Sequence, residues 1–390
     1  MKLVQSNKRA AKGQGSIRQR ADGTFEGRTT INGERKSFYG EKQSDVVKAM
    51  RTAKKSADDG VYFEPTRLTV GKWLETWINE YVASSVKPLT LAAYQSQIRT
   101  NISPALGKLK LSALNATQIQ KFYNDLTRVN GLSAKTVKNV HGILHKALVK
   151  AVELRYIGYN PADACTLPRI EKKEIQPLTE AEMKAFLAAI SEGERFKDLF
   201  TVALFTGMRE GEICGLSWDS VDFENGTITV RQQLQREKIK GGSFYIASTK
   251  NDKIRKNTPA PFVMTILKEV KRKQAENRLK VGRAWANKWD LVFVDEIGNH
   301  MFPDTVLGRF KRVAAKIGKP EARFHDLRHT YAVTALQEGD DIKTVQVNLG
   351  HATASFTLDV YGHVSEKMRN DSAARMENFI KSISPNSYKG

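Results

Sequence analysis

Two segments without hydrophobic periodicity interrupt this chain, and they constrain its fold because neither can belong to a regular packed element. They cover residues 61–68 and residues 164–176, and the second segment also carries charge. A chain of 390 residues is too long for one ordinary core and suits two or three domains. We therefore expect three domains, at residues 1–63, 66–165 and 177–390.

The first part predicts a three-stranded sheet followed by one helix. The turn pairs Asp22-Gly23 and Asn32-Gly33 separate runs in which polar and apolar residues alternate, which is the strongest short-range signal of β-hairpins. Helical spacing then extends over about residues 44–57. We expect the basic side chains of the strands to contact a DNA groove, and the alternative is a solvated sheet face. These side chains are Arg18, Arg20, Arg28, Arg35 and Lys36.

Helical periodicity dominates the second part, which predicts an all-α bundle. Pro88, Asn115 and Ser133 are suitable start signals for its helices, and Asn160-Pro161 is a stop signal. Aromatic residues at helical spacing are expected to form its core rather than to stack on bases. The expected helices cover residues 70–82, 89–102, 117–129 and 134–153. The last helix carries a basic face that we expect to contact DNA phosphates, formed by Lys135, Lys138, Lys146 and Lys150.

The third part has a mixed pattern that is mainly helical. Its expected strands cover residues 227–234 and 243–248. Its expected helices cover residues 180–191, 196–206, 260–278, 304–317, 326–338 and 341–349. The predicted fold class is therefore multidomain α+β. It combines a small three-stranded sheet plus one helix, an all-α bundle, and a mixed, mainly α domain with a small antiparallel sheet.

The charge of the chain indicates a polyanionic partner. The formal net charge is +21, and residues 66–173 alone carry 16 Lys and Arg against 6 Asp and Glu. A role in solubility alone would not concentrate positive charge in one segment that is poor in acids. Nucleic acid is the partner that this distribution favours.

The remaining composition favours a cytoplasmic protein. Cys165 and Cys214 are the only cysteines, and their spacing suits neither a disulfide framework nor a cysteine-rich zinc site. No stretch reaches the apolar length of a membrane span, and the basic N-terminus lacks the apolar core of an export signal. We expect no contact with a membrane.

Three phrases in the third part carry residues that suit phosphate chemistry. They are Thr206-Gly-Met-Arg209-Glu-Gly-Glu212, Arg323-Phe-His-Asp-Leu-Arg-His-Thr330, and Leu349-Gly-His351 with the later Tyr361-Gly-His363. Breaking a DNA strand without a metal requires positive groups on the phosphate oxygens, an aimed nucleophile, and a proton for the leaving oxygen. Arg209 and Arg328 can supply the positive groups, because a guanidinium stays charged and binds phosphate oxygens in pairs.

Two other interpretations compete for these segments. His325 and His329 have the spacing of a metal pair, but the stretch lacks the glutamate of the zinc-peptidase motif and an obvious third ligand, so we expect no metal site. Residues 332–351 have the pattern of a helix-turn-helix repressor. A repressor, however, would not also need Arg209, Arg328 and Tyr361.

Together and in this order, the motifs resemble those of the tyrosine recombinase (phage integrase) family over most of residues 178–365. The two preceding parts are similar to the arm-binding and core-binding domains of integrases from temperate phages and conjugative transposons. The C-terminal motifs are highly specific as a set, whereas the similarity of the N-terminal parts is looser.

The resemblance implies a role for each matching position. Tyr361 would attack the scissile phosphate, form a 3′-phosphotyrosine and release a 5′-hydroxyl. Arg209, Arg328 and His351 would stabilise the phosphorane. His325 would act beside the nucleophile as a general base or as a hydrogen-bond partner.

Two further positions follow from the same resemblance. Lys250, in Ser248-Thr-Lys250-Asn-Asp, resembles the family's hairpin lysine, which protonates the leaving oxygen, although it also suits an ordinary turn with Lys253 and Lys256 nearby. Glu212 would orient the Arg209 guanidinium, and the alternative for it is a surface carboxylate on a helix.

The resemblance also implies the partners of the chain. They are double-stranded DNA with core and arm sites, a homotetramer on DNA that passes through a Holliday junction, and accessory proteins that bend DNA or direct excision. No cofactor is implied, because the phosphotyrosine conserves the bond energy and the sequence has no Walker-type loop for ATP. Residues 365–390 would form the C-terminal tail, docked on the chain itself or on a neighbouring subunit.

The expected function is integration and excision of a mobile element. A type IB topoisomerase uses similar chemistry, but arm and core domains in this order count against it. The alternative without catalysis is a regulatory, sequence-specific DNA-binding protein, against which the complete set of catalytic residue types argues.

Overall fold

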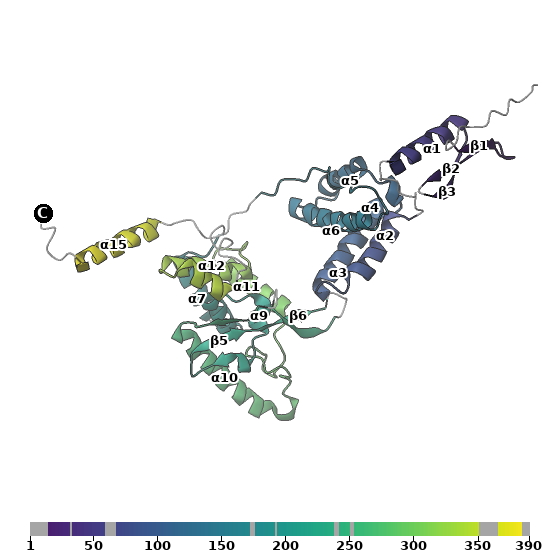
Figure 1. The fold of residues 1–390 in the computed structure, drawn as a ribbon. Helices are drawn as coiled ribbons and strands as arrows, with labels where there is room; N and C mark the ends of the chain where they lie inside the picture. Colours follow the sequence, from purple (N-terminus) through teal and green to yellow (C-terminus); the bar gives the residue numbers. More distant parts are fainter. Residues whose placement is uncertain are drawn as a thin grey trace, which may run out of the picture. The chain divides into compact units, whose positions relative to one another are not determined.

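The computed structural model describes residues 15–31, 33–58, 68–171, 176–191, 193–237, 242–249, 253–350 and 366–383. Contacts along the chain divide it into two compact units, residues 1–172 and residues 173–390 (Figure 1). None of the helices in these ranges combines the length and the apolar character that a membrane span requires.

A small antiparallel sheet with one helix opens the first unit, as the turn pairs predict. Its strands are β1 (Ser16–Gln19), β2 (Phe25–Ile31) and β3 (Glu34–Gly40), and they pair in the order β1-β2-β3. Helix α1 (Gln43–Asp58) covers one face and buries Val46 and Met50. The sheet and α1 are in close contact at Gly27, where an added Cβ would lie 2.3 Å from Met50 Sδ.

A helical bundle completes the first unit, and its helix starts agree with the sequence prediction. Pro88 is the first residue of α3, Asn115 and Gln118 form a reciprocal capping box at α5, and Ser133 caps α6. Its main helices are α2 (Val70–Thr76), α3 (Pro88–Gln97), α4 (Ser103–Leu106), α5 (Ala116–Arg128) and α6 (Ala134–Glu153). Residues 77–82 and 98–102 continue α2 and α3 as π-helical turns.

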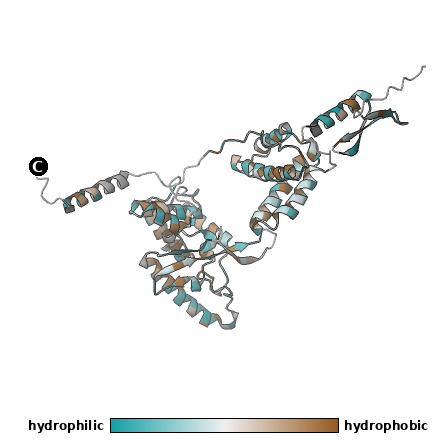
Figure 2. Ribbon diagram, viewed as in Figure 1, coloured by the Kyte–Doolittle hydropathy of each residue, from teal (hydrophilic) through white to brown (hydrophobic). Residues whose placement is uncertain are grey.

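Packing in this bundle follows the predicted helix faces. Trp73 is buried, and its indole N–H donates a 2.9 Å hydrogen bond to the carbonyl oxygen of Ala147, which ties α2 to α6. Phe122, Leu144 and Leu148 are buried in the same core. Hydrophobic and hydrophilic residues alternate along these helices (Figure 2), as expected for helices with one buried face.

The second unit is mainly helical and contains two small antiparallel sheets. Its helices are α7 (Glu180–Ser191), α8 (Lys197–Thr206), α9 (Glu210–Cys214), α10 (Pro261–Val281), α11 (Pro303–Lys316), α12 (Phe324–Gln337), α13 (Ile342–Leu349) and α15 (Glu366–Ile383). One sheet contains β4 (Val221–Asp222), β5 (Thr227–Val230) and β8 (Arg255–Asn257), and the other contains β6 (Gln232–Arg236) and β7 (Phe244–Ser248).

The sheets differ from the sequence prediction in two respects. The strand expected at residues 227–234 is two strands, because the chain changes sheets at Arg231: β5 pairs with β4 and β8, whereas β6 pairs with β7. Strand β8 and helix α9 are not among the elements whose bounds were predicted. They have three and five residues, which is too short for hydrophobic periodicity to indicate them.

Four phenylalanine rings hold the helices of this unit around one centre. Phe186 of α7, Phe200 of α8, Phe310 of α11 and Phe324 of α12 are buried, and the centroids of neighbouring rings lie 5.7 to 6.2 Å apart. Rings at this separation attract one another beyond the area they bury. Because Phe324 directly precedes His325, this cluster fixes the start of α12 against α8.

Gly215 lets α9 pack directly on β6. A Cβ at this position would lie 2.4 Å from the backbone nitrogen of Leu234, so Gly215→Ala must separate α9 from the strand. We expect this variant to lower the free energy of unfolding by about 1–3 kcal/mol, as overpacking does. The matched control is Gly308→Ala in α11, where an added Cβ meets no atom within 4 Å. Urea unfolding should show that Gly308→Ala is neutral or stabilising by up to ~1 kcal/mol, and an equal loss in both variants would contradict the packing argument.

Candidate active site

The turn between α8 and α9 presents Arg209. Gly207, which ends α8, has a φ of +62°, a left-handed conformation that favours glycine. A Cβ there would also lie 2.6 Å from Leu349 Cδ2, so α13 passes close to this turn. The chain reverses at this glycine, and the Arg209 side chain keeps 28% of its surface exposed. An anion can therefore reach its guanidinium.

Glu212 holds Arg209 from within the domain. Its side chain is 1% exposed and accepts a 2.6 Å hydrogen bond from Arg209 Nη1 and a 2.9 Å bond from the Arg209 backbone N–H. The structure therefore brings together the two residues that the first motif was expected to pair. The carboxylate is not on the surface.

Arg255 of β8, which is not among the site residues predicted from the sequence, binds the same carboxylate. Arg255 Nη1 and Nη2 donate to Glu212 Oε1 and Oε2 at 3.0 and 2.6 Å, and the Arg255 side chain is 6% exposed. Its Nε donates a 2.9 Å hydrogen bond to the carbonyl oxygen of Asn348, which also accepts from Asn257 Nδ2. In the sequence Arg255 is one cation within a basic run, and no motif distinguishes it.

Two glutamates of α9 have opposite pKa shifts. Burial raises the pKa of Glu212, but the hydrogen bond and charge of Arg255, followed by the charge and backbone N–H of Arg209, outweigh it and lower the pKa to about 2. Burial also raises the pKa of Glu210, where the nearby charge of Asp304 adds to the effect and the result is about 7. Glu210 Oε1 is buried and has no hydrogen-bond partner in the described part of the chain.

Arg328 joins α12 to the ends of two other helices. It is 2% exposed, and its Nη1 and Nη2 donate to the carbonyl oxygens of Gly207 and Leu349 at 2.8 and 2.5 Å. Both carbonyls belong to helix ends, where carbonyl groups lack partners within the helix. Arg328 therefore contributes to the frame of the site as well as to its positive charge.

His325 lies within electrostatic reach of both motif arginines. Partial burial of the ring, and then the positive charges of Arg328 and Arg209, lower the pKa of His325 to about 4. The His329 ring packs edge-on against it with centroids 4.8 Å apart, and burial and the His325 ring lower the pKa of His329 to about 4 as well. Both imidazoles are therefore neutral at pH 7. Arg209, which is distant in the sequence, therefore meets His325 and Arg328 in one site.

The metal interpretation gains no further ligand from the structure. Among the described residues, no group of three or more His, Cys, Asp or Glu side chains is placed to hold a metal ion.

Lys250, His351 and Tyr361 lie outside the described residues. Segments that adjoin the first two are described. Thr249 Oγ1 donates a 2.7 Å hydrogen bond to the carbonyl oxygen of Lys253, and these two residues border the undescribed stretch that contains Lys250. Helix α13 ends at Leu349, where Arg255 and Arg328 bind two successive carbonyls just before His351.

The basic residues of the N-terminal sheet are divided between its two faces. Side chains alternate along a strand, and directly paired residues share a face. Arg18 pairs with Glu26, and Arg28 pairs with Ser16. Both arginines therefore lie on the face of the sheet opposite α1 and Gly27, which we call the open face. Arg35, which pairs with Thr30, lies on that open face, and the Arg20 guanidinium stacks over Tyr39 there.

Lys36 lies on the other side of this sheet. It pairs with Thr29, which shares the α1 face with Gly27, and its side chain is 19% exposed and forms an ion pair with Glu34. On the open face, Arg18 and Arg28 both bind the buried carboxylate of Glu26. The open face is therefore basic, with the buried Glu26 carboxylate between Arg18 and Arg28. Lys36 does not contribute to this face.

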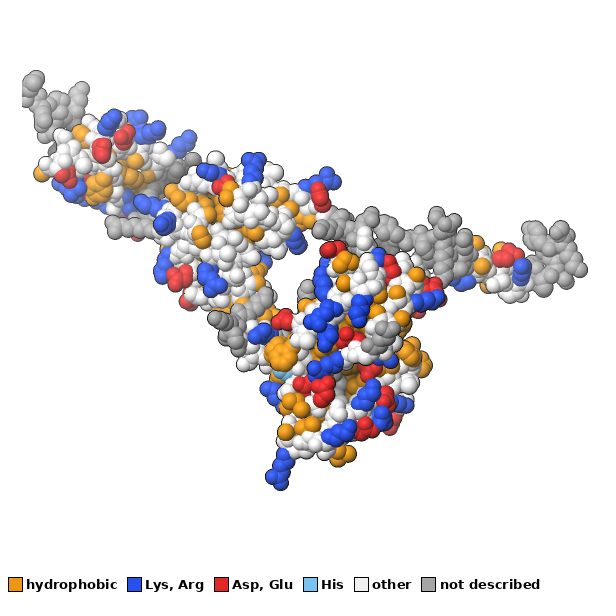
Figure 3. Space-filling view, turned by 180° about the vertical axis from the view of Figure 1, so that it is seen from behind, with side chains coloured by type: hydrophobic (Ala, Val, Ile, Leu, Met, Phe, Trp, Pro, Cys, Tyr) orange, Lys and Arg blue, Asp and Glu red, His pale blue; other side chains and the backbone are white. Residues whose placement is uncertain are grey.

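The basic face predicted for α6 is exposed in part. Lys135 is exposed, Lys138 is half-buried, and Lys146 Nζ donates a 3.1 Å hydrogen bond to the Tyr94 hydroxyl. Lys150 is bound to Glu153. Space-filling views show Lys and Arg side chains on the surface of both units (Figure 3).

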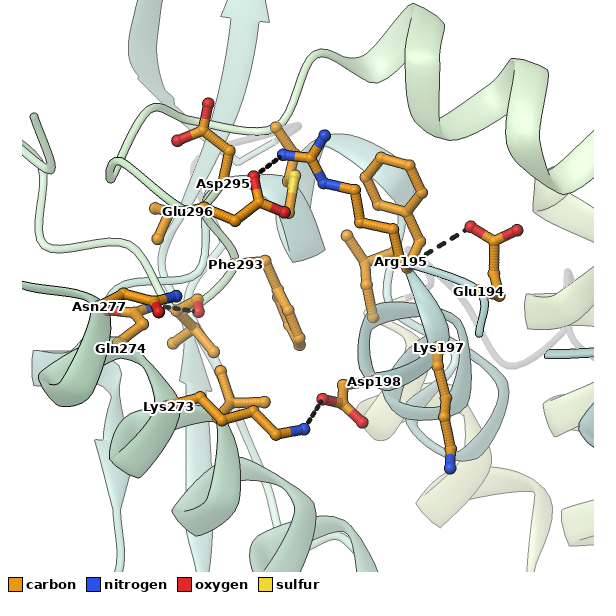
Figure 4. Close-up of a pocket in the computed structure, with 16 residues that line it drawn as sticks. Glu194, Arg195, Lys197, Asp198, Lys273, Gln274, Asn277, Phe293, Asp295 and Glu296 are labelled. Atoms are coloured by element: carbon orange, nitrogen blue, oxygen red, sulfur yellow. Dashed lines mark hydrogen bonds and ion pairs between the residues drawn. The ribbon is translucent and has the colours of Figure 1, made fainter. Parts of the chain in front are cut away.

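A pocket of about 300 Å³ lies elsewhere in the second unit, between the start of α8, α10 and residues 292–301 (Figure 4). Ion pairs between Arg195 and Glu296 and between Lys273 and Asp198 form its walls. Arg209, His325 and Arg328, the expected catalytic residues that the structure describes, are not among the residues that line it. The pocket is therefore separate from the arginine cluster.

The opposite pKa shifts of Glu212 and Glu210 predict how stability depends on pH in two matched variants. The pKa of Glu212 is below its usual 4.5, so its charge stabilises the fold above about pH 4.5 and this effect is lost as the pH falls toward 2. Glu212→Gln should therefore lower the free energy of unfolding by about 3 kcal/mol at both about pH 5 and about pH 8. Because the pKa of Glu210 is raised above its usual 4.5, the fold loses stability as the pH rises from about 4.5 to about 7, and the full loss remains above pH 7.

Glu210→Gln is the control, two residues away in the same helix. We expect it to match the wild type at about pH 5 and to be at least as stable at about pH 8. Urea unfolding of both variants at the two pH values measures this difference. If Glu210→Gln were destabilised as much as Glu212→Gln, the assignment of the two environments would be wrong.

Comparisons with known proteins agree with the motifs and the fold. Residues 176–368 match the Phage integrase family, and residues 69–127 match the family described as Phage integrase, N-terminal SAM-like domain. The chain is 32% identical over 367 residues to "Tyrosine recombinase XerC-like" of Caldanaerobacter subterraneus subsp. tengcongensis, which covers 89% of this chain and 92% of the relative. It is 26% identical to the ICEBs1 integrase of Bacillus subtilis over 78% of this chain and 83% of that protein.

Solved structures give the same fold. A Tn1549 transposon integrase, solved in complex with a circular intermediate DNA, has a TM-score of 0.67 at 23% identity and covers 79% of this chain and 99% of that chain. The predicted fold class is thereby confirmed. The chain belongs to the tyrosine recombinase (phage integrase) family of enzymes, which carry out site-specific recombination on DNA.

Proposed function

We propose that this chain integrates and excises a mobile element by cutting and rejoining DNA through a 3′-phosphotyrosine on Tyr361. The observation that carries this proposal is the cluster of Arg209, His325 and Arg328, in which the charges of two guanidinium groups act on an uncharged imidazole. Glu212 is shared with Arg255 and does not balance this positive charge, whereas a scissile phosphate would. Similarity to the ICEBs1 integrase and to the integrase of the Tn1549 transposon supports the mobile-element assignment.

Each residue has a distinct part in the proposed reaction. Tyr361 attacks the phosphorus in line and displaces the 5′ oxygen, to which Lys250 donates a proton. Arg209, Arg328 and His351 stabilise the negative charge that builds on the nonbridging oxygens. His325 accepts a hydrogen bond or proton near the nucleophile. Rejoining runs the same steps in reverse, with a 5′-hydroxyl as the nucleophile.

A phosphate would also change the titration of His325. The charges of Arg328 and Arg209 contribute to holding its pKa at about 4. A bound phosphodiester carries negative charge, which offsets them and raises the pKa of His325 toward its ordinary value. The imidazole is therefore a stronger base when DNA is in the site than when it is empty.

We further propose the domain roles and the assembly. Residues 1–63 bind arm DNA, residues 66–165 bind the core site, and residues 177–390 perform the chemistry. A lambda integrase tetramer has been solved on a Holliday junction, and we infer a homotetramer on DNA here too. Met376 and Phe379 of α15 are exposed, which suits docking of this tail on a neighbouring subunit. DNA-bending and excision proteins would assist the reaction.

Covalent trapping tests the proposed chemistry. The wild type and Tyr361→Phe are incubated with a library of nicked duplexes, treated with SDS and protease, and the captured DNA is sequenced. We expect adducts on one shared sequence with the wild type and none with Tyr361→Phe, which should still bind DNA. Adducts that persist in Tyr361→Phe would identify another nucleophile. Adducts without sequence preference would favour a topoisomerase, and binding without any adduct would favour a regulator.

Two neighbouring residues of β3 test the arm-binding role. Arg35 lies on the open face of the sheet, whereas Lys36 lies on the α1 face in an ion pair. Arg35→Ala should weaken binding to arm DNA and reduce the slope of log affinity against log salt by about 1, since each phosphate contact releases counterions. Lys36→Ala should leave both quantities unchanged. Equal losses in the two variants would contradict the assignment of the open face to DNA.

A further inference from the structure

We propose that Arg255 is a positioning residue for strand cleavage, which holds Arg209 and the end of α13 in one arrangement by binding Glu212 and the Asn348 carbonyl. This inference rests on the proposed function, because it concerns the same site. Arg255 belongs to none of the three motifs that contain the proposed catalytic residues.

Two arginines share one buried carboxylate at this site. Glu212 Oε1 accepts from Arg209 Nη1 and Arg255 Nη1, and Glu212 Oε2 accepts from Arg255 Nη2 and the Arg209 backbone N–H. A carboxylate has about four acceptor positions, so these bonds fill it. Without Arg255, half of them are lost, and the carboxylate is free to rotate toward Arg209. The Arg209 guanidinium then loses its fixed orientation.

Arg255 also holds the end of α13, which precedes His351 in the chain. Its Nε binds the Asn348 carbonyl oxygen at 2.9 Å, in the last turn of α13. Its side chain also lies against Gly350, where an added Cβ would be 3.0 Å from Arg255 Cδ. A cation at a helix C-terminus satisfies free carbonyls and interacts favourably with the helix dipole. One side chain therefore connects α9 with the residue that precedes His351.

Arg255 acts through Glu212 and the end of α13 rather than by contacting DNA. Its side chain is 6% exposed, against 28% for Arg209, and its Nε, Nη1 and Nη2 all donate to protein oxygens. In lowering the pKa of Glu212, Arg255 contributes more than Arg209 does. Arg255 is thus the main partner of the carboxylate, and Arg209 is the partner that DNA can reach.

The chemistry of this position requires arginine. The planar guanidinium places two donors on Glu212 and a third, Nε, in a different direction toward Asn348. Lysine has its donors on a single nitrogen and lacks this fork, so it keeps the charge but not the simultaneous contacts. Arg255→Lys therefore separates positioning from charge.

The test uses the full-length chain and the nicked core-site duplex obtained by covalent trapping. DNA affinity is measured by titration, and the rate and final amount of phosphotyrosine adduct are measured with protein in excess at saturation. We expect Arg255→Lys to slow adduct formation by about 10- to 100-fold, the effect of a small misplacement of a catalytic group, with affinity and final amount unchanged. Arg272→Lys, an exposed arginine of α10 bound to Glu269, is the matched control and should react like the wild type.

A purely structural role predicts a different result. It would lower the final amount of adduct while the folded fraction reacts at the wild-type rate, and that result would overturn the proposal. Weaker DNA binding with an unchanged rate would also overturn it, because Arg255 would then contact DNA. Absence of any adduct with the wild type would instead refute the proposed function itself.

Coupling to Arg209 provides a second measurement. Because Arg255 acts partly through Arg209, combining Arg255→Lys with Arg209→Ala should slow the reaction by less than the product of the two separate effects, and a full product would overturn the proposal. Should Arg255→Lys not fold, Glu212→Asp replaces it, because the shorter side chain keeps its charge but cannot hold both guanidinium groups in place. A wild-type rate in Glu212→Asp would then overturn the proposal.

Discussion

The negative charge of Glu212 is removed from water, and two guanidinium groups take the place of its hydration. A buried carboxylate without partners would be protonated or would destabilise the fold by several kcal/mol. Here Arg255 and Arg209 keep it ionised, so that three elements, α9, β8 and the end of α13, are fixed by one ionic network. Arg328 adds a second connection between the same regions through the carbonyls of Gly207 and Leu349. The positions of Arg209 and Arg328 depend on these bonds.

The same network leaves an excess of positive charge. Arg209, Arg255 and Arg328 are set against the single carboxylate of Glu212, while Asp326 is bound to Arg323. The two histidines add no charge, because burial and the surrounding cations keep them neutral. A site with unbalanced positive charge and one exposed guanidinium is suited to an anion that arrives from outside. The charge that stabilises the fold and the charge that would bind phosphate therefore belong to one arrangement.

Much of the secondary structure and several of the site residues could be predicted from the sequence. The features that could not be predicted have one physical reason in common. Helices with capping residues and long apolar faces, such as α5 and α6, agree with their predicted bounds within one residue. Strand β8 and helix α9 are too short to show a period, and Arg255 meets Glu212 across 43 residues of chain, which no local pattern encodes. The faces of the N-terminal sheet depend on register, which assigns Arg35 and Lys36 to opposite sides although both are basic strand residues. The order of the motifs indicated the catalytic candidates, whereas only the fold shows which other residues hold them in place.

The division of labour among the arginines follows from what electrostatic catalysis requires. A group that stabilises charge in a transition state must already be oriented, because reorientation during the reaction would consume the energy it supplies. An arginine side chain on a surface has many rotamers, and fixing it costs entropy. At this site the buried arginines, Arg255 and Arg328, are held by backbone carbonyls and by Glu212, and Arg209 is held by that carboxylate in turn. The exposed guanidinium thus obtains a fixed orientation from groups that DNA does not reach, so that the entropy of ordering it is lost on folding rather than at the moment of cleavage.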